Sequence, residues 1–345
     1  MSADAVLKSA VESVVEPYTG QTLATLKMVK SVSAGRVEIG LPTPAYQKQA
    51  ELAAAVHAAV GDAVEVEFRT ETTGKSAGRK IGLHVKNIIA VGSGKGGVGK
   101  STVAASLACG LRHFGARVGL MDADVYGPSI PHLVGAKGQP EVRQYQTNDG
   151  RTIERIQPIE VDGLKLMSMG FMVGEDQAVI WRGPMLHKAL SQFLQQSDWG
   201  ELDYLVIDMP PGTGDVALTL SQMVPLSGAV VVCTPQQVAL LDAVKAVSMF
   251  RTVKIPVLGM VENMSGEIFG RGGAKAKAES LGIPFLGELS ANALIREEGD
   301  AGQIGRLFAK DNAARPALLD ICCQAAMRVA ADAAQTPAMP TLEIL

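Results

Sequence analysis

The sequence is poor in cysteine and contains no long apolar run. Its 345 residues include four cysteines, Cys109, Cys233, Cys322 and Cys323, without regular spacing. This scarcity excludes a disulfide scaffold and indicates a reducing compartment. No apolar run approaches the roughly 20 residues that a membrane-spanning helix needs. The N-terminus carries acidic residues where a signal peptide carries basic ones. We therefore expect a cytoplasmic protein that does not associate with membranes.

The chain also lacks an excess of basic residues. It has 32 lysines and arginines against 35 aspartates and glutamates, a net charge of −3, which argues against nucleic acid as a partner. Its five histidines show no metal-ligand spacing. With 47% apolar residues, a chain of this length can bury a large core, and two domains are expected.

The hydrophobic pattern divides the chain. Residues 1–70 predict a small α/β domain with the order helix, strand, strand, helix, strand. Residues 71–84 form a polar stretch without apolar periodicity, which indicates a linker. Residues 85–335 are expected to form the second domain, and residues 336–345 a loosely attached tail.

In residues 85–335, apolar strands alternate with helices. The segments NIIAVG, RVGLMD, YLVIDM and GAVVVCT are continuously apolar, as strands covered on both faces should be. Helical segments such as STVAASLACGLRHF separate them. The pattern predicts an α/β fold with a doubly wound, mainly parallel sheet. Residues 139–183 interrupt it, and we expect an inserted hairpin or edge strand there.

The stretch GSGKGGVGKST at residues 92–102 matches G-x-x-x-x-G-K-[ST] between a strand and a helix. In such a P-loop, backbone N–H groups converge on phosphate oxygens at a helix N-terminus. Lys100 is placed for the β- and γ-phosphates of ATP, Ser101 for Mg²⁺ and Thr102 for the α-phosphate. The predicted ATP-binding loop comprises Gly94, Lys95, Gly96, Gly97, Val98, Gly99, Lys100, Ser101 and Thr102.

Polar residues follow the neighbouring strands. Asp122 and Asp124 end the strand RVGLMD, and Asp208 ends YLVID as in a Walker B motif, which holds Mg²⁺. Because ligand sites lie at the carboxyl ends of parallel strands, these groups should meet at the P-loop. Asn263 ends a later strand, and its amide can pair with both donor and acceptor edges of adenine.

A second lysine, Lys95, stands early in the loop. The residues GKGGVGKS (94–101) resemble the deviant Walker A loop of the MinD/Mrp group of P-loop ATPases. The resemblance implies that Lys95 reaches across a homodimer interface to the partner's phosphates. A solvated lysine in a flexible loop is the alternative.

Further motifs narrow the resemblance. MDADVYGPSIPHLVG, WRGPM, DYLVIDMPPGTGD and VENMS are similar to the Mrp/ApbC branch, the iron–sulfur cluster carrier ATPases, and the N-terminal unit is similar to an iron–sulfur assembly domain. The resemblance implies a slow Mg-dependent ATPase in which Asp124 positions the attacking water and Lys95 and Lys100 act on phosphate. It also implies that Asp122 supports the magnesium shell and that Asn263 selects ATP. Trp181 and Arg182 belong either to the dimer surface or to hairpin packing.

The sequence departs from this branch in its thiols. The branch carries a C-x-x-C pair just after VENMS, so that two subunits share a [4Fe–4S] cluster, but no cysteine lies between Asn263 and Phe269 here. Tyr46 also stands where relatives often carry a cysteine. Cys322 and Cys323 are the remaining candidate ligands, although neighbours on a helix point about 100° apart.

Two functions remain open. The first is a homodimeric ATPase that binds iron–sulfur clusters and transfers them to apoproteins or assembly factors. The alternative is a nucleotide-switched adaptor of the same fold that carries no cluster, because the C-x-x-C motif is absent.

Overall fold

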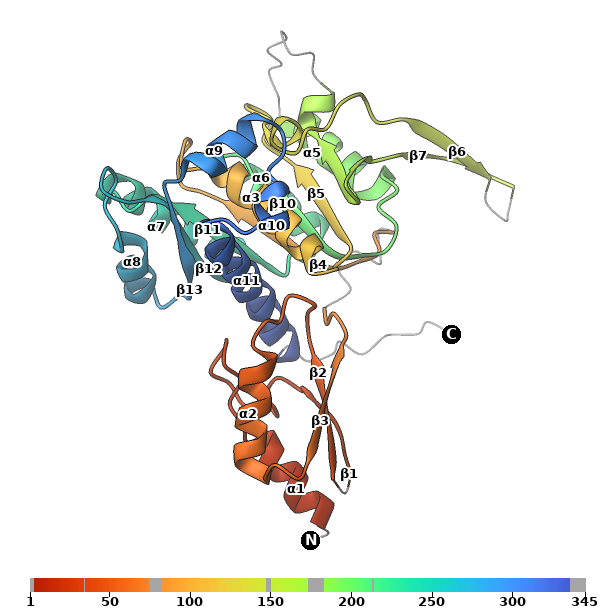
Figure 1. Cartoon of the computed structure of the whole chain (residues 1–345). Helices are drawn as coiled ribbons and strands as arrows, with labels where there is room; N and C mark the ends of the chain where they lie inside the picture. The colour runs from red at the N-terminus through yellow and green to blue at the C-terminus, as the bar shows by residue number, and fades with distance from the viewer. Residues whose placement is uncertain are drawn as a thin grey trace. The chain divides into compact units, whose positions relative to one another are not determined.

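The computed structural model describes residues 3–33, 35–74, 82–146, 150–172, 183–212 and 214–335. The chain divides into two compact units (Figure 1). One comprises residues 1–74 together with 326–345, and the other comprises residues 75–325. Residues 326–335, the last that the structure describes, thus belong to the same unit as residues 3–74. Residues 75–81 of the expected linker and all of the expected tail lie outside the described residues.

The N-terminal unit has the predicted order of elements. These are α1 (Ala3–Glu12), β1 (Val29–Ser33), β2 (Arg36–Leu41), α2 (Gln49–Val60) and β3 (Glu65–Thr70). Strand β2 pairs antiparallel with β1 and parallel with β3. Alternate apolar residues of β2, such as Val37 and Ile39, are fully buried, as are Leu52 and Val56 of α2. The alternation of period two and the helical spacing therefore direct one face of each element to a common core.

The larger unit alternates strands and helices. Its first half contains β4 (Val85–Gly92), α3 (Lys100–His113), β5 (Val118–Asp122), α4 (Ile130–Val134), β6 (Val142–Gln146), β7 (Thr152–Ile156), β8 (Ile159–Val161), β9 (Leu164–Ser168), α5 (Gly183–Ser191) and the short η3 (Gln192–Gln196). Its second half contains β10 (Leu202–Asp208), α6 (Gly214–Met223), β11 (Gly228–Cys233), α7 (Gln237–Thr252), β12 (Val257–Ser265), α8 (Gly273–Leu281), β13 (Phe285–Ser290), α9 (Ala293–Asp300) and α10 (Arg306–Ala309). Helix α11 (Arg315–Gln335) begins in this unit.

The sheet confirms the expected doubly wound architecture. Its order is β13-β12-β11-β4-β10-β5-β9-β8, and every pair is parallel except β8 with β9. Strand β4, which leads into the P-loop, lies between β11 and β10. The P-loop therefore stands at the middle of the carboxyl edge, where the strand order changes direction and ligands bind in such sheets.

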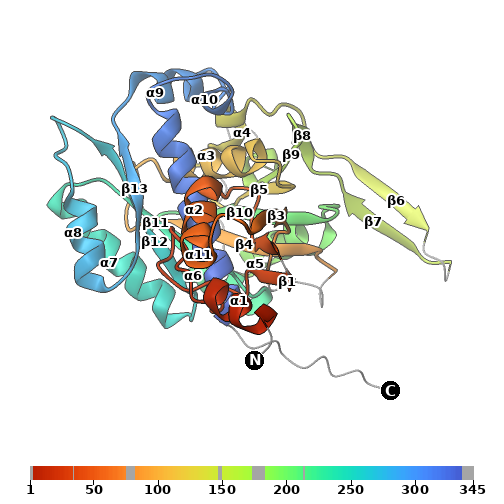
Figure 2. The same cartoon turned by 60° about the horizontal axis from the view of Figure 1, so that its bottom comes forward.

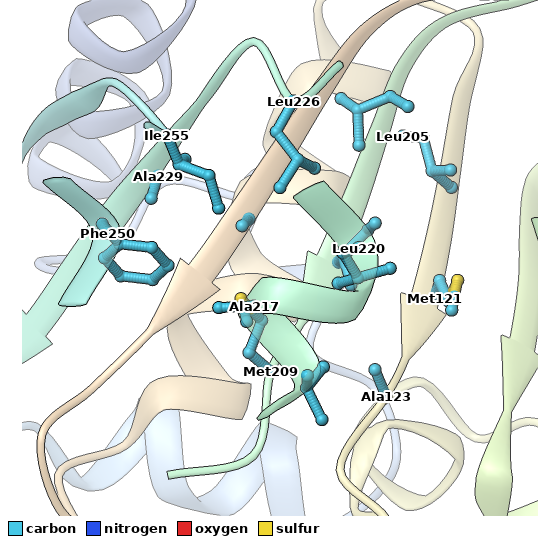
Figure 3. Packing of buried hydrophobic residues seen from close by; sticks show 14 of the residues in the cluster. Met121, Ala123, Leu205, Met209, Ala217, Leu220, Leu226, Ala229, Phe250 and Ile255 are labelled. Carbon is cyan, nitrogen blue, oxygen red and sulfur yellow. The ribbon is translucent and has the colours of Figure 1, made fainter. Parts of the chain in front are cut away.

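Apolar side chains fix the position of β4 (Figure 3). Phe250 of α7 is fully buried, and a Cβ added at Gly92 would lie 2.7 Å from its ring. Only glycine at the last residue of β4 lets this ring pack against the strand. Ala217 and Leu220 of α6 belong to the same buried cluster. Helices α6 and α7 thus hold the strand from which the P-loop departs.

The insertion at 139–183 contains more than the expected hairpin or edge strand. Strands β6 and β7 form a separate antiparallel ribbon that projects from the body of the unit (Figures 1 and 2). Strand β8 is an antiparallel edge strand, while β9 joins the parallel sheet beside β5. The residues LKLMS of β9 are almost all buried, which explains why this strand lies inside the sheet. Across the described residues, no helix has the length and apolarity needed to cross a bilayer.

Candidate nucleotide site

The P-loop joins β4 to α3, as the sequence predicts. Gly97 and Gly99 adopt φ angles of +78° and +80°, a region that side chains with a Cβ rarely occupy. A Cβ at Gly94 would lie 2.0 Å from the carbonyl oxygen of Asp242. The glycines are therefore required both by backbone conformation and by close packing.

Lys100 lies between two of the predicted carboxylates. Its Nζ is 2.7 Å from Asp208 Oδ1 and 3.5 Å from Asp124 Oδ2, and it donates to Ser101 Oγ at 3.1 Å. These residues come from α3, from the end of β10 and from the turn after β5. The structure thus brings together groups that are far apart in the sequence, at the predicted edge of the sheet.

Asp124 is oriented by its own loop. Its Oδ1 accepts hydrogen bonds from the backbone N–H groups of Tyr126 and Gly127, both at 3.2 Å. Its other oxygen, Oδ2, is the one that faces Lys100. A carboxylate held in this way by main-chain donors keeps one oxygen directed at the space beside the lysine.

Asp122 is buried deeper than Asp124 and has a structural set of partners. It accepts hydrogen bonds from the N–H groups of Asp124 and Ile130 and from Ser168 Oγ, at 3.0–3.2 Å. Burial, and then the charge of Asp208, raise the pKa of the Asp122 carboxyl to about 8. Burial likewise raises the pKa of Asp208. The burial of two neighbouring carboxyl groups thus disfavours the charged form of each.

The charge balance of the site favours a cation. Two carboxyl groups, those of Asp124 and Asp208, contact the ammonium of Lys100, and the carboxyl of Asp122 is buried beside that of Asp208. Asp208 Oδ2 is buried and has no hydrogen-bond partner among the described residues. A buried carboxylate oxygen without a partner is costly unless a cation or water satisfies it. Ser101 and Asp208, with Asp122 behind them, fit the oxygen ligands that Mg²⁺ takes beside nucleotide phosphates.

Asn263 contacts the P-loop itself. Its Nδ2 donates to the carbonyl oxygen of Val98 at 2.9 Å, and the residue is 6% exposed. A Cβ at Gly99 would lie 2.1 Å from this amide nitrogen. The side chain thus supports the loop, a role that the position of Asn263 at a strand end did not reveal.

A cavity of about 520 Å³ adjoins Thr102 and Asn263. It lies beside the end of the P-loop that is placed for the α-phosphate, where the base and sugar of a nucleotide would follow. Its lining includes residues that the sequence did not single out, namely Leu133, Met264, Phe269, Ser290, Ala291, Asn292, Ala293, Ile295, Arg296, Gly299 and Asp300. They come from segments without a motif, so only their position after neighbouring strands could have identified them.

Lys95 is half-buried, and its side chain has no hydrogen bond or ion pair with any described residue. Apolar residues lie exposed close to it. Val238 and Leu241, at the start of α7, are 66% and 62% exposed, and Asp242 in the same turn packs against Gly94. Trp181 and Arg182 lie outside the described residues.

The cysteines do not form an accessible cluster site. Cys322 and Cys323 are 1% and 0% exposed, and Cys322 Sγ packs against α3, 3.9 Å from the carbonyl oxygen of Leu107. Burial, followed by the neighbouring thiols, raises the pKa of Cys322, and burial raises that of Cys109 to about 12. Both thiols therefore pack in the apolar core, and Cys322 and Cys323 stay candidate cluster ligands that only a movement of α11 would expose. No group of three or more potential metal ligands occurs among the described residues.

Two places lack the cysteines that the related branch carries, namely the segment after Asn263 and position 46. Both are well packed in this structure. Backbone hydrogen bonds join Gly266 and Gly270 in both directions, at 2.8 and 2.9 Å, so the segment after Asn263 is a tight turn. Tyr46 is buried, and its hydroxyl donates to Glu16 Oε1 at 2.8 Å.

Comparisons with known proteins agree with the motifs. A family model described as ParA, NUBPL iron-transfer P-loop NTPase, matches residues 84–326. The "iron-sulfur cluster carrier protein" of Haemophilus influenzae is 45% identical over 317 residues, covering 86% of this chain and 84% of that protein. The protein of the same name in Deinococcus radiodurans is 43% identical over 334 residues, covering 91% and 92%.

Solved structures support the same fold. A nucleotide-binding protein from Archaeoglobus fulgidus, in complex with ADP, is 37% identical with a TM-score of 0.54, covering 64% of this chain and 88% of that one. The cell division ATPase MinD of Pyrococcus furiosus, 21% identical with a TM-score of 0.53 over 69% of this chain and 97% of that one, shows the shared architecture alone. The resemblance stated from the motifs is confirmed: the chain belongs to the NUBPL iron-transfer P-loop NTPases of the ParA group.

Proposed function

We propose that this chain is an Mg-dependent ATPase that works as a homodimer and carries iron–sulfur clusters to apoproteins or assembly factors. The observation that carries the ATPase half is the placement of Lys100 between Asp208 and Asp124 at the end of a P-loop. The carrier half is supported by relatives of that name that are 43–45% identical over most of their length.

The geometry supports a direct role for each residue in hydrolysis. When ATP binds, Lys100 pairs with the β- and γ-phosphates, and its contact with Asp124 Oδ2 is released. That oxygen then accepts a hydrogen bond from a water molecule and orients it toward the γ-phosphorus. The water oxygen forms the new bond to phosphorus as the bond to the β-phosphate bridging oxygen breaks, which yields ADP and phosphate. Mg²⁺, held by Ser101 and by Asp208, would supply charge neutralisation at the phosphates.

The dimer is proposed from Lys95 and its surroundings. Lys95 has no partner within the described part of its own chain, and the exposed apolar residues Val238 and Leu241 lie on the adjoining turn of α7. A second copy facing this surface would cover the apolar side chains and receive Lys95 at its phosphates. This arrangement makes hydrolysis depend on association.

The buried thiols constrain how the cargo is held. Because all four cysteines are buried in the described structure, cluster binding by this chain requires either that α11 separates from α3 or that a client protein supplies ligands. The same burial is the observation behind the alternative, an adaptor that switches with nucleotide and carries no cluster.

Anaerobic reconstitution with iron and sulfide tests these functions against each other. Iron, labile sulfide and visible absorption are measured per dimer for the wild type, for Cys322→Ala/Cys323→Ala and for the control Cys233→Ala. We expect a stoichiometric cluster in the wild type. Its loss in the double variant alone would assign the ligands to α11. A wild type that hydrolyses ATP but binds no cluster, either alone or mixed with an apo iron–sulfur protein, would overturn the carrier function and leave the adaptor.

A further inference from the structure

Another cavity lies in the larger unit, away from the P-loop. Its volume is about 370 Å³, which is within the range of small-molecule sites. It opens where the end of α3, the end of α4, the turn between β8 and β9 and the segment between α9 and α10 meet. The lining includes Cys109, Arg112, Gly135, Asp162, Gly305 and Arg306.

The walls of this cavity are held by close backbone contacts. A Cβ at Gly135 would lie 2.5 Å from the carbonyl oxygen of Gly302, so the segments after α4 and α9 touch there. Asp162 and Gly163 both have positive φ angles, +49° and +77°, as a two-residue hairpin turn requires. Arg112 Nη1 donates to the carbonyl oxygen of Asp162 and ties this turn to α3. The cavity is therefore a built feature of the fold.

Its polar groups favour an anion. Arg112 and Arg306 both line the cavity, against the single carboxylate of Asp162. Arg112 is half-buried, and its Nε is buried without a hydrogen-bond partner among the described residues, whereas Arg306 is exposed. A buried guanidinium nitrogen without an acceptor costs free energy that an anionic ligand would recover. Cys109, one turn before Arg112 on the same helix, is neutral at physiological pH, because burial raises the pKa of its thiol to about 12.

We propose that this cavity is a binding site for a small anion that bears a phosphate or carboxylate group, recognised by Arg112 and Arg306. The site is separate from the nucleotide site. Arg112 follows Lys100 by 12 positions in α3, which places it about 18 Å farther along the helix axis. Neither ATP hydrolysis nor cluster binding is needed for the proposal to hold.

Isothermal titration calorimetry on the full chain tests the site. The protein is first saturated with Mg²⁺ and a non-hydrolysable ATP analogue, so that added phosphate cannot enter the P-loop. Inorganic phosphate and citrate are then titrated separately, which distinguishes the two ligand chemistries. We expect saturable binding of at least one probe with one site per chain.

Two variants alter the cavity, one by removing a positive charge and the other by filling the space. Arg112→Gln removes a cationic partner and should weaken binding about tenfold or more. Gly305→Leu keeps the charges but fills the space, since Gly305 has φ −60° and its Cβ would point at Cys109 Sγ from 3.8 Å. It should weaken binding at least as much. Arg143→Gln, at an arginine whose side chain is 62% exposed on the β6–β7 ribbon, is the matched control and should bind as the wild type does.

Circular dichroism verifies that each variant is folded, and Arg306→Gln replaces Arg112→Gln if the latter is not. The proposal is overturned if neither probe binds saturably, or if binding is unchanged in Gly305→Leu and in the folded arginine variant. Loss of binding in both, with Arg143→Gln unaffected, establishes the site.

Discussion

The side-chain amide of Asn263 donates a hydrogen bond to the carbonyl oxygen of Val98 across 2.9 Å, which ties the end of β12 to the P-loop. The resemblance assigns this asparagine to adenine recognition, while the structure gives it a contact with the phosphate-binding segment. A residue that acts only on the base affects ATP and GTP differently. A residue that holds the loop affects every nucleotide.

We therefore predict that Asn263→Ala weakens the binding of ADP and GDP by similar factors. The variant loses one hydrogen bond of about 1 kcal/mol, so each Kd should rise roughly fivefold. Fluorescence titration with both nucleotides measures this. A loss confined to ADP would contradict support of the loop and restore base recognition as the sole role.

Two glycines of the P-loop provide a matched pair. Gly97 and Gly99 share φ angles of +78° and +80°, but a Cβ at Gly97 meets nothing within 4 Å, whereas one at Gly99 lies 2.1 Å from Asn263 Nδ2. Each alanine variant bears the backbone strain of about 1–2 kcal/mol, and only Gly99→Ala also displaces Asn263. We predict that nucleotide affinity falls further in Gly99→Ala than in Gly97→Ala. Equal losses, measured by titration calorimetry, would show that the Asn263 contact is unimportant.

Substitution of Lys95 should affect ATP hydrolysis but not ATP binding. Because Lys95 has no partner among the described residues of its own chain, Lys95→Ala should leave the Kd for ATP within about twofold of wild type. Steady-state hydrolysis should fall about 100-fold or more, since a charge supplied in trans to phosphate has effects of that order or larger. Lys275→Ala, at an exposed position of α8, is the control. Normal turnover in Lys95→Ala would rule out a dimer in which Lys95 reaches the phosphates bound by the partner.

The sequence sufficed to predict the P-loop, its carboxylates and the parallel sheet, because each has a signature in a short stretch of sequence. These signatures are the glycine-rich motif, the aspartates that directly follow apolar strands, and the alternation of strands with helices. The residues around Lys100 follow β4, β10 and β5, which are neighbours in the parallel sheet and therefore end at the same edge. Cys322 and Cys323 could not be placed in the same way, since a helix of alanines, leucines and cysteines shows its apolar face but not what covers it. The structure puts α3 against that face: Gly110 leaves the space that Cys322 Sγ occupies, 2.4 Å from where a Cβ would be.

In the N-terminal unit, Tyr46 stands where relatives often carry a cysteine, and its contribution to stability can be tested. Glu16 is fully buried and accepts hydrogen bonds from Tyr18 N, Thr19 N, Thr19 Oγ1 and Tyr46 Oη, at 2.8–2.9 Å. Burial, and then Glu16, raise the pKa of Tyr46, so its hydroxyl stays a donor. Tyr46→Phe removes one donor from a buried carboxyl group and should destabilise the unit by about 1–3 kcal/mol.

Urea denaturation followed by hydrogen exchange resolves that loss. Exchange should accelerate in β1, β2 and α2 of the N-terminal unit, while protection of the P-loop helix α3 stays at the wild-type level, because Tyr46 packs within its own unit. Tyr145→Phe is the matched control, since that hydroxyl makes only two long contacts, with Asp198 and Gln157 at 3.3 Å each, at an exposed site, and its stability should be unchanged. A Tyr46→Phe variant as stable as this control would mean that Glu16 is held well enough by its remaining donors, and that the tyrosine was retained for its ring, which meets Tyr18 edge-on with centroids 5.3 Å apart.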